Sequence, residues 1–201
     1  MKIGIIVLAA GPSLRFGDTI KQLLTFNGTT LVRKATETAL AAELGGPVVV
    51  VLGASKALVA PEVANLPVTV IDNNLYEQGI ASSIKTGLVA VHLTQTELDA
   101  VIFLPCDQPL VSAVLLKKLA ITWAESGRGI VATRYDGQLG TPVLFGWHYL
   151  NELLDLEGDH GPKWVLMKHK GDRNEVIFEP AALDLNSWAD VERMSGKGQK
   201  L

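Results

Sequence analysis

The chain opens with Ile3-Gly4-Ile5-Ile6-Val7-Leu8-Ala9-Ala10-Gly11-Pro12-Ser13-Leu14-Arg15-Phe16-Gly17, and Lys21 follows shortly after. A continuous run of β-branched and other apolar residues is typical of a strand that is buried on both faces of a parallel sheet. This strand leads directly into a loop of small residues that ends near two cations, as an anion-binding site requires. We call residues 9–17 the anion loop.

The spacing of this loop excludes two common phosphate-binding motifs. A Walker A loop places four residues between its first Gly and a Gly-Lys pair, whereas five residues separate Gly11 from Gly17 and Asp18 follows. The dinucleotide fingerprint Gly-x-Gly-x-x-Gly is absent because Ser13 stands in place of its second glycine. The remaining design is a loop that a ligand can approach closely, with Arg15 and Lys21 adding positive charge. It suits a triphosphate.

Length and composition narrow the class of protein. With 201 residues, 48% of them hydrophobic, the chain can bury one sizeable core, and we expect a single domain over residues 1–194 and a disordered tail over 195–201. The net charge of −3 argues against a nucleic-acid partner. The first apolar run suits a strand better than a signal peptide, no run is long enough to span a membrane, and the single cysteine fits a reducing compartment. We therefore expect a cytoplasmic protein with no membrane contact.

Apolar runs of strand length alternate with segments of helical periodicity along the chain. The expected strands are residues 3–8, 47–52, 68–71, 100–104, 129–133, 142–145 and 175–178, and the expected helices are 30–44, 81–92, 112–126, 147–156 and 162–168. Such alternation predicts a mainly parallel sheet that helices cover. Ligands of these sheets lie beyond the carboxyl ends of the strands, so we expect the anion loop to face residues 106–109.

Asp107 follows the expected strand 100–104, in a turn that Pro105 and Pro109 stiffen. A carboxylate at a strand end can bind Mg²⁺, which prefers one or two carboxylates together with substrate phosphates and water. The alternative role is an N-cap of the following helix, but Ser112 is available for that position. We therefore predict that Asp107 is a metal ligand.

A second polar segment, Leu183-Asp184-Leu185-Asn186-Ser187-Trp188, lies near the C-terminus. If this segment is extended, Asp184 and Asn186 point to the same side, and either could complete a cation site. Asn186-Ser187 is also a typical N-cap pair for a final helix, which is the commoner explanation. The local sequence leaves this choice open.

Three further segments carry polar groups with two possible roles. Ser82 and Ser83 lie in the first turn of an expected helix, where hydroxyl and N–H groups either contact a base, ribose or phosphate or cap the helix. The segments 140–145 and 157–163 are equally compatible with plain turns. His160, beside Asp159 and Gly161, is more typical of a solvated turn than of a general base.

Zinc sites and nucleophilic catalysis are not indicated. His92, His148 and His169 lack the spacing of zinc ligands, and one cysteine cannot supply a thiolate cluster. The chain has no Gly-x-Ser-x-Gly motif. The carboxylate of Asp107 disfavours a thiolate at Cys106, so we interpret Cys106 as a packing residue.

Together the motifs resemble the MobA/MocA-like nucleotidyltransferases, most closely the molybdenum cofactor cytidylyltransferases. The resemblance extends from Ile3 to Met194 and rests on an ordered set: Leu8-Ala9-Ala10-Gly11-x-Ser13-x-Arg15-Phe16-Gly17 with Lys21, Asp107-Gln108-Pro109, Gly140-x-Pro142-Val143-Leu144-Phe145, Gly158-Asp159-x-Gly161, and Asp184-x-Asn186. An ordered set is much more specific than any single motif. The resemblance implies a three-layer α/β/α Rossmann-like nucleotidyltransferase fold with a mainly parallel sheet. It also implies transfer of a nucleotidyl group from an NTP to an acceptor phosphate, with release of pyrophosphate.

The resemblance implies roles for individual residues. The catalytic residues would be Arg15, Lys21 and Asp107, and the ligands of Mg²⁺ would be Asp107 and Asn186. The nucleotide would contact Leu8, Ala9, Ala10, Gly11, Ser13, Arg15, Lys21, Ser82, Ser83 and Asp107. The acceptor would contact Gly140, Pro142, Asp159 and Lys163. The expected partners are these small molecules and, transiently, a molybdoenzyme or its maturation chaperone.

The chain departs from the family pattern at three places. Three residues, not the usual two, separate Gly17 from Lys21. Pro162-Lys163 replaces a common Ala-Arg pair, so a point charge stands where a bidentate guanidinium is usual. Ser187-Trp188-Ala189-Asp190 replaces a Thr-Pro-Glu-Asp run.

The leading hypothesis is transfer of CMP from CTP to molybdopterin, because guanylyl-transferring relatives tend to carry Gly where Ala10 stands. A second hypothesis keeps this chemistry but uses a sugar phosphate or another small phosphorylated metabolite as acceptor. A third is a non-catalytic carrier or chaperone of the molybdenum cofactor. The presence of Arg15, Lys21 and Asp107 favours an enzyme over the carrier.

Overall fold

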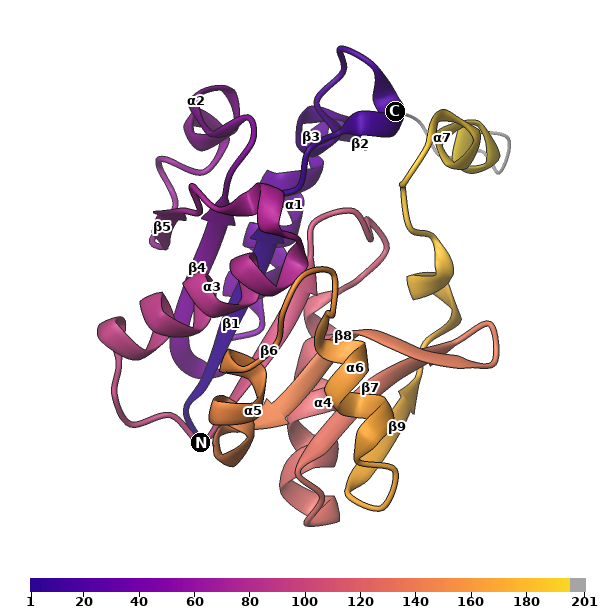
Figure 1. Cartoon of the computed structure of the whole chain (residues 1–201). Coiled ribbons are helices and arrows are strands. Elements are labelled where there is room, and N and C mark those ends of the chain that lie inside the picture. Colours follow the sequence, from indigo (N-terminus) through magenta and orange to yellow (C-terminus); the bar gives the residue numbers. More distant parts are fainter. Residues whose placement is uncertain (196–201) are drawn as a thin grey trace.

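A computed structural model describes residues 1–195 (Figure 1). Within this range seven strands form the central sheet in the order β5-β4-β1-β6-β8-β7-β9. Their bounds are β1 Ile3–Ala9, β4 Gly45–Leu52, β5 Thr69–Asp72, β6 Ala100–Pro105, β7 Ile130–Tyr135, β8 Gln138–Gly146 and β9 Arg173–Ile177. β8 runs antiparallel to β6 and β7, and all other neighbours in this sheet are parallel. The expected mainly parallel sheet is confirmed.

Helices cover both faces of the sheet (Figure 1). One face packs against α1 (Leu31–Ala41) and α4 (Ala113–Ser126), and the other against α3 (Ile80–Thr94), α5 (Leu150–Leu154) and α6 (Pro162–Lys168). β1 contributes to both layers because its side chains alternate: Ile5 and Val7 join the first, and Ile6 and Leu8 join the second. The three-layer Rossmann-like fold is therefore confirmed.

Several element bounds differ from the sequence predictions. β8 begins at Gln138 rather than at residue 142 because Asp136 and Gly137, both with positive φ, make a tight turn that pairs it with β7. The helix expected over 147–156 is a short 3-10 turn, Trp147–Tyr149, followed by α5. A short helix, α2 (Lys56–Val59), and a small hairpin of β2 (Thr25–Phe26) and β3 (Thr29–Thr30) were not predicted.

The C-terminal segment returns to the anion loop, at the carboxyl end of β1 (Figure 1). A small apolar cluster joins the loop, the β2–β3 hairpin, α1 and this segment, with the buried members Phe16, Phe26, Leu31, Leu185 and Val191. The segment ends in α7 (Trp188–Ser195). Ser195 therefore belongs to a helix rather than to the expected tail, and residues 196–201 lie outside the described part of the chain. Among the described helices, none is long and apolar enough to cross a membrane.

Candidate functional site

The backbone carbonyls at the start of the anion loop, and that of the preceding Leu8, are hydrogen-bonded within the protein. The carbonyl oxygens of Leu8 and Ala10 accept hydrogen bonds from the backbone N–H groups of Cys106 (3.2 Å) and Ala54 (3.2 Å). Those of Ala9 and Gly11 accept from the side chain of Gln22. Four consecutive carbonyl oxygens thus accept from protein donors and are turned away from a ligand. An anion at the loop would then meet backbone N–H groups.

Gln22 was not singled out from the sequence. It is buried, and its Oε1 accepts a hydrogen bond from Ser13 Oγ at 3.2 Å. Ser13 Oγ in turn accepts from the backbone N–H of Lys21 at 2.7 Å. The available signal was a polar residue between Lys21 and the apolar pair Leu23-Leu24, in a segment that packs against the sheet.

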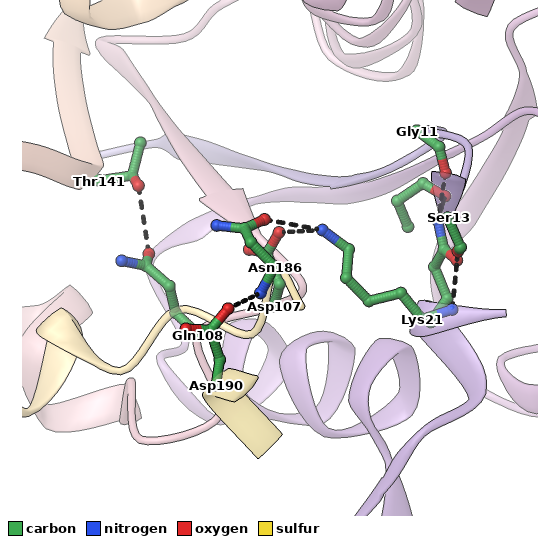
Figure 2. Close-up of polar contacts among 10 residues, drawn as sticks. Gly11, Ser13, Lys21, Asp107, Gln108, Thr141, Asn186 and Asp190 are labelled. Carbon is green, nitrogen blue, oxygen red and sulfur yellow. Dashed lines mark hydrogen bonds and ion pairs between the residues drawn. The ribbon is translucent and has the colours of Figure 1, made fainter. Parts of the chain in front are cut away.

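The Lys21 side chain extends from beside Ser13 to the end of β6 (Figure 2). Its ammonium group lies 2.6 Å from Asp107 Oδ2 and 3.3 Å from Asn186 Oδ1, and the side chains of Lys21 and Asp107 are each only 16% exposed. Burial, the largest single influence, would lower the pKa of Lys21, but the charge and hydrogen bond of Asp107, together with Cys106 and Asp184, outweigh it, so the pKa lies above its ordinary value. Residues far apart in the sequence thus form one polar cluster.

Asp184 adds a second carboxylate to this cluster. Burial, together with the negative charge of Asp107, raises the pKa of Asp184 to about 6. Its Oδ1 is buried and has no hydrogen-bond partner in the described structure. An unpaired buried carboxylate oxygen is costly, so a cation that binds beside Asp184 would stabilise its charge.

The donor set fits a divalent cation shared with phosphates. Within the described residues, no group of three or more His, Cys, Asp or Glu side chains forms a complete metal cage. Asp107, Asp184 and the amide oxygen of Asn186 instead offer a small set of oxygen donors, which suits Mg²⁺ or Mn²⁺ when substrate supplies the remaining ligands. From the sequence, either Asp184 or Asn186 could complete a cation site with Asp107. The structure brings both residues close to Asp107.

Asn186 and Ser187 immediately precede α7, where the N-cap interpretation placed them, and both donate to Asp190 in its first turn. Asp190 Oδ2 accepts a hydrogen bond from the backbone N–H of Asn186 at 3.0 Å (Figure 2). It also accepts one from Ser187 Oγ at 2.8 Å. Burial opposes ionisation of Asp190, but these donors and Arg193 lower its pKa below the ordinary value. The start of α7 therefore holds the backbone of Asn186 while its side chain points to Lys21.

Arg15 lies on the open side of the anion loop. A pocket of about 240 Å³ is lined by Pro12, Ser13, Leu14, Arg15, Phe16, Lys21 and Asn186. Arg15 is exposed, whereas Phe16 is buried against Trp188 at the start of α7. The pocket therefore places two cations beside the carboxylate cluster, as a triphosphate with a metal ion requires.

The serines predicted to contact the nucleotide are engaged by the protein. The buried Asn73 donates from Nδ2 to Ser82 Oγ (2.8 Å) and Ser83 Oγ (3.0 Å), and Ser83 is itself buried. Ser82 also donates to the carbonyl of Gly79. Ser82 borders a separate pocket of about 470 Å³ beside α3. These contacts show the serines bracing the loop before α3, while their predicted contact with nucleotide stays a prediction.

The segments predicted for the acceptor meet at the start of β8. Gly140 lies so close to Tyr135 that a Cβ at position 140 would be 2.2 Å from Tyr135 Oη. Thr141, which precedes Pro142 through a cis peptide bond, donates to Gln108 Oε1 at 3.2 Å (Figure 2). The Gln108 Nε2 donates to the carbonyl of Ala181 at 2.8 Å, which ties this strand to the C-terminal segment.

The other two residues predicted to contact the acceptor, Asp159 and Lys163, lie beside different elements, the turn before α3 and the start of β8. Asp159 Oδ1 lies beside Gly79, in the turn that precedes α3, and Lys163 Nζ donates to Gln138 Oε1 at 3.4 Å. His160 stacks on Trp164, with ring centroids 4.1 Å apart, and is exposed as expected for a turn histidine.

Cys106 packs in the interior below Asp107. It is buried, and burial raises its pKa to about 12, with Asp107 adding to the rise. The prediction that Cys106 packs in the interior is confirmed.

Comparison with known proteins finds relatives over most of the chain. Residues 5–173 match the family model described as the MobA-like NTP transferase domain. A curated relative, nicotine blue oxidoreductase from Paenarthrobacter nicotinovorans, is 34% identical over 119 residues, which are 58% of this chain and 55% of that protein. The chain thus spans about half the length of this relative.

Solved structures share the whole fold. Rv0371c from Mycobacterium tuberculosis is 27% identical, with a TM-score of 0.83 over 96% of this chain and 97% of that chain. A complex of Rv0371c with manganese is matched at 25% identity, with a TM-score of 0.78 over 96% of this chain and 98% of that chain.

Proposed function

This chain belongs to the MobA-like NTP transferase family and is a nucleotidyltransferase, and we propose that it transfers CMP from CTP to a phosphate of a molybdopterin-type acceptor. The observation that carries the proposal is the cluster of Lys21, Asp107, Asp184 and Asn186 beside the anion loop. Two carboxylates and a lysine, next to a loop whose first carbonyls are hydrogen-bonded within the protein, suit a metal-bound triphosphate.

The proposed step is an in-line displacement at the α-phosphorus. An oxygen of the acceptor phosphate, already anionic at neutral pH, forms a new bond to this phosphorus as the bond to the bridging oxygen of the β-phosphate breaks. Pyrophosphate takes the electron pair and leaves, so no side chain needs to remove a proton. The work of the protein is to align two anions and to neutralise their charge.

The residues of the cluster divide this work. Arg15 and Lys21 would neutralise the triphosphate and the departing pyrophosphate, and the anion loop would fix the position of the phosphates. Asp107, Asp184 and Asn186 would hold Mg²⁺ or Mn²⁺, which when bound supplies positive charge to the phosphate oxygens. Manganese in the complex of Rv0371c is consistent with a divalent ion in this fold.

The choice of CTP rests on the ordered motif set and on Ala10, whose methyl group should crowd a purine base. The methyl group of Ala10 is buried and lies beside Gly53, in a layer that also contains Tyr76. Ala10 would therefore limit the size of the base that the site accepts through the packing of the 73–79 loop. The loop after β1 lacks the dinucleotide fingerprint, so the proposed function includes no redox step.

The test is a pyrophosphate-release assay with CTP, GTP, UTP and ATP, Mg²⁺ and molybdopterin, with the product identified by mass spectrometry. We expect release with CTP and a nucleotidylated acceptor. A clear preference for GTP or UTP would refute the choice of CTP. Nucleotide transfer to a sugar phosphate but not to molybdopterin would refute the choice of acceptor.

Asp107→Ala tests the metal assignment. We expect turnover to fall by roughly two orders of magnitude or more, as for loss of one charge-stabilising group. Glu125→Ala, which changes an exposed acid at the far end of α4, is the matched control and should keep its activity. Near-normal turnover of Asp107→Ala at limiting Mg²⁺ would overturn the assignment.

A further inference from the structure

The amide of Gln22 is buried beneath the anion loop, with only 3% of the residue exposed. Its Nε2 donates to the carbonyl oxygens of Ala9 (3.1 Å) and Gly11 (2.7 Å), and its Oε1 accepts from Ser13 Oγ (3.2 Å). Both neighbours of Nε2 are pure acceptors, so the amide cannot be turned over without losing these bonds. Gln22 is therefore committed to the loop.

These bonds decide which end of each peptide group a ligand meets. A carbonyl that accepts from an interior donor directs its partial negative charge into the protein. Gln22 holds two of the four consecutive carbonyls from residue 8 to residue 11, and backbone N–H groups hold the other two. An anion at the loop then meets N–H groups rather than carbonyl oxygens.

The same side chain also fixes the start of Lys21. Ser13 Oγ donates to Gln22 and accepts from the backbone N–H of Lys21 at 2.7 Å. Gln22 follows Lys21 directly in the chain, so the three residues form a closed ring of covalent and hydrogen bonds. The root of the Lys21 side chain is thereby tied to the loop that it serves.

We infer that Gln22 is a positioning residue for the triphosphate, whose amide keeps the carbonyls of the anion loop turned inward and the root of Lys21 in place. This inference rests on the proposed function and deepens it. In Gln22→Met, a side chain of similar shape without donors, the buried carbonyl of Ala9 and the partly buried carbonyl of Gly11 lose their partner and can turn toward the ligand. We expect the Kd for CTP to rise about 10- to 100-fold.

The test measures the binding of CTP, CMP and inorganic tripolyphosphate by calorimetry, together with the Tm. Leu119→Ala is the matched control, because Leu119 is fully buried in α4, a helix that packs against β7 and β9, and its truncation lowers stability without touching the loop. We expect Gln22→Met to weaken CTP and tripolyphosphate by similar factors and CMP by less than about threefold. Leu119→Ala should leave all three affinities within about twofold despite a lower Tm.

Equal weakening of CMP and CTP in Gln22→Met, or unchanged CTP binding, would overturn the inference. If Gln22→Met does not fold, Ser13→Ala replaces it, since it removes the hydroxyl between Gln22 and Lys21 and leaves the loop carbonyls paired. Its Kd for tripolyphosphate should rise about 3- to 10-fold, and an unchanged value would overturn the inference. A wild-type protein that binds no nucleotide refutes the proposed function as well, whereas normal wild-type binding with an unaffected variant refutes only the role of Gln22.

Discussion

Replacing Lys21 by Met should have opposite effects on metal and on nucleotide. In the structure the Lys21 ammonium group lies 2.6 Å from Asp107 Oδ2, so it occupies the carboxylate that we assign to the metal. A divalent ion that binds without nucleotide must share or displace this cation. Lys21→Met removes the ammonium group that is paired with Asp107 and should therefore let the variant bind the free metal ion more tightly.

The magnitude follows from the burial of the ion pair. Both side chains are 16% exposed, and at an effective dielectric constant near 20 two unit charges about 4 Å apart attract by about 4 kcal/mol. Removal of Lys21 from water offsets most of this attraction, and a hydrogen bond to a charged group is worth about 1.5 to 3 kcal/mol net. We therefore expect the Kd for Mn²⁺ to fall by about 10-fold or more, since each 1.4 kcal/mol is roughly a factor of ten.

The assay is titration with Mn²⁺ in the absence of nucleotide, followed by electron paramagnetic resonance of the free ion at neutral pH. The matched control is Arg15→Met, because Arg15 lines the same pocket but forms no ion pair among the described residues. It should leave Mn²⁺ affinity within about twofold, while both variants weaken CTP. Unchanged or weaker Mn²⁺ binding in Lys21→Met would refute the view that Lys21 occupies the metal position.

Three further outcomes are expected. Asp184 has a pKa raised to about 6, so its buried charge destabilises the fold fully above about pH 6 and not at all below its unfolded pKa. Asp184→Asn should therefore raise the Tm at neutral pH, and this gain should vanish in acid. Asp172 has a pKa lowered by the Gly129 N–H and by Tyr149, so its charge stabilises the fold above its unfolded pKa. Asp172→Asn should lower the Tm at neutral pH, and the loss should disappear as the pH falls through the pKa of Asp172 in the folded protein. Gly140→Ala places a Cβ 2.2 Å from Tyr135 Oη, so the KM for acceptor should rise at least about fivefold with little change in the Kd for CTP.

Much of the architecture was predictable from local patterns. The apolar run from Ile3 and the alternation of strands and helices predicted the parallel sheet, because a strand buried on both faces must be apolar throughout. The bounds of α6 agree with the prediction, because Pro162 sets its first turn. The short segments α2, β2 and β3 were missed because they are too short to show a period.

The sequence by itself determined the chemistry of the anion loop and the place of Asp107 at a strand end. Only the tertiary structure decided how that chemistry is assembled. The pairing of Lys21 with Asp107 spans 86 residues, and that with Asn186 spans 165, so no local spacing encodes either contact. Asp184, with its unpaired Oδ1, and the buried Gln22 owe their properties to desolvation and to groups that the folded chain brings near. A residue's type is local, whereas its burial and electrostatic neighbours exist only after the layers have packed.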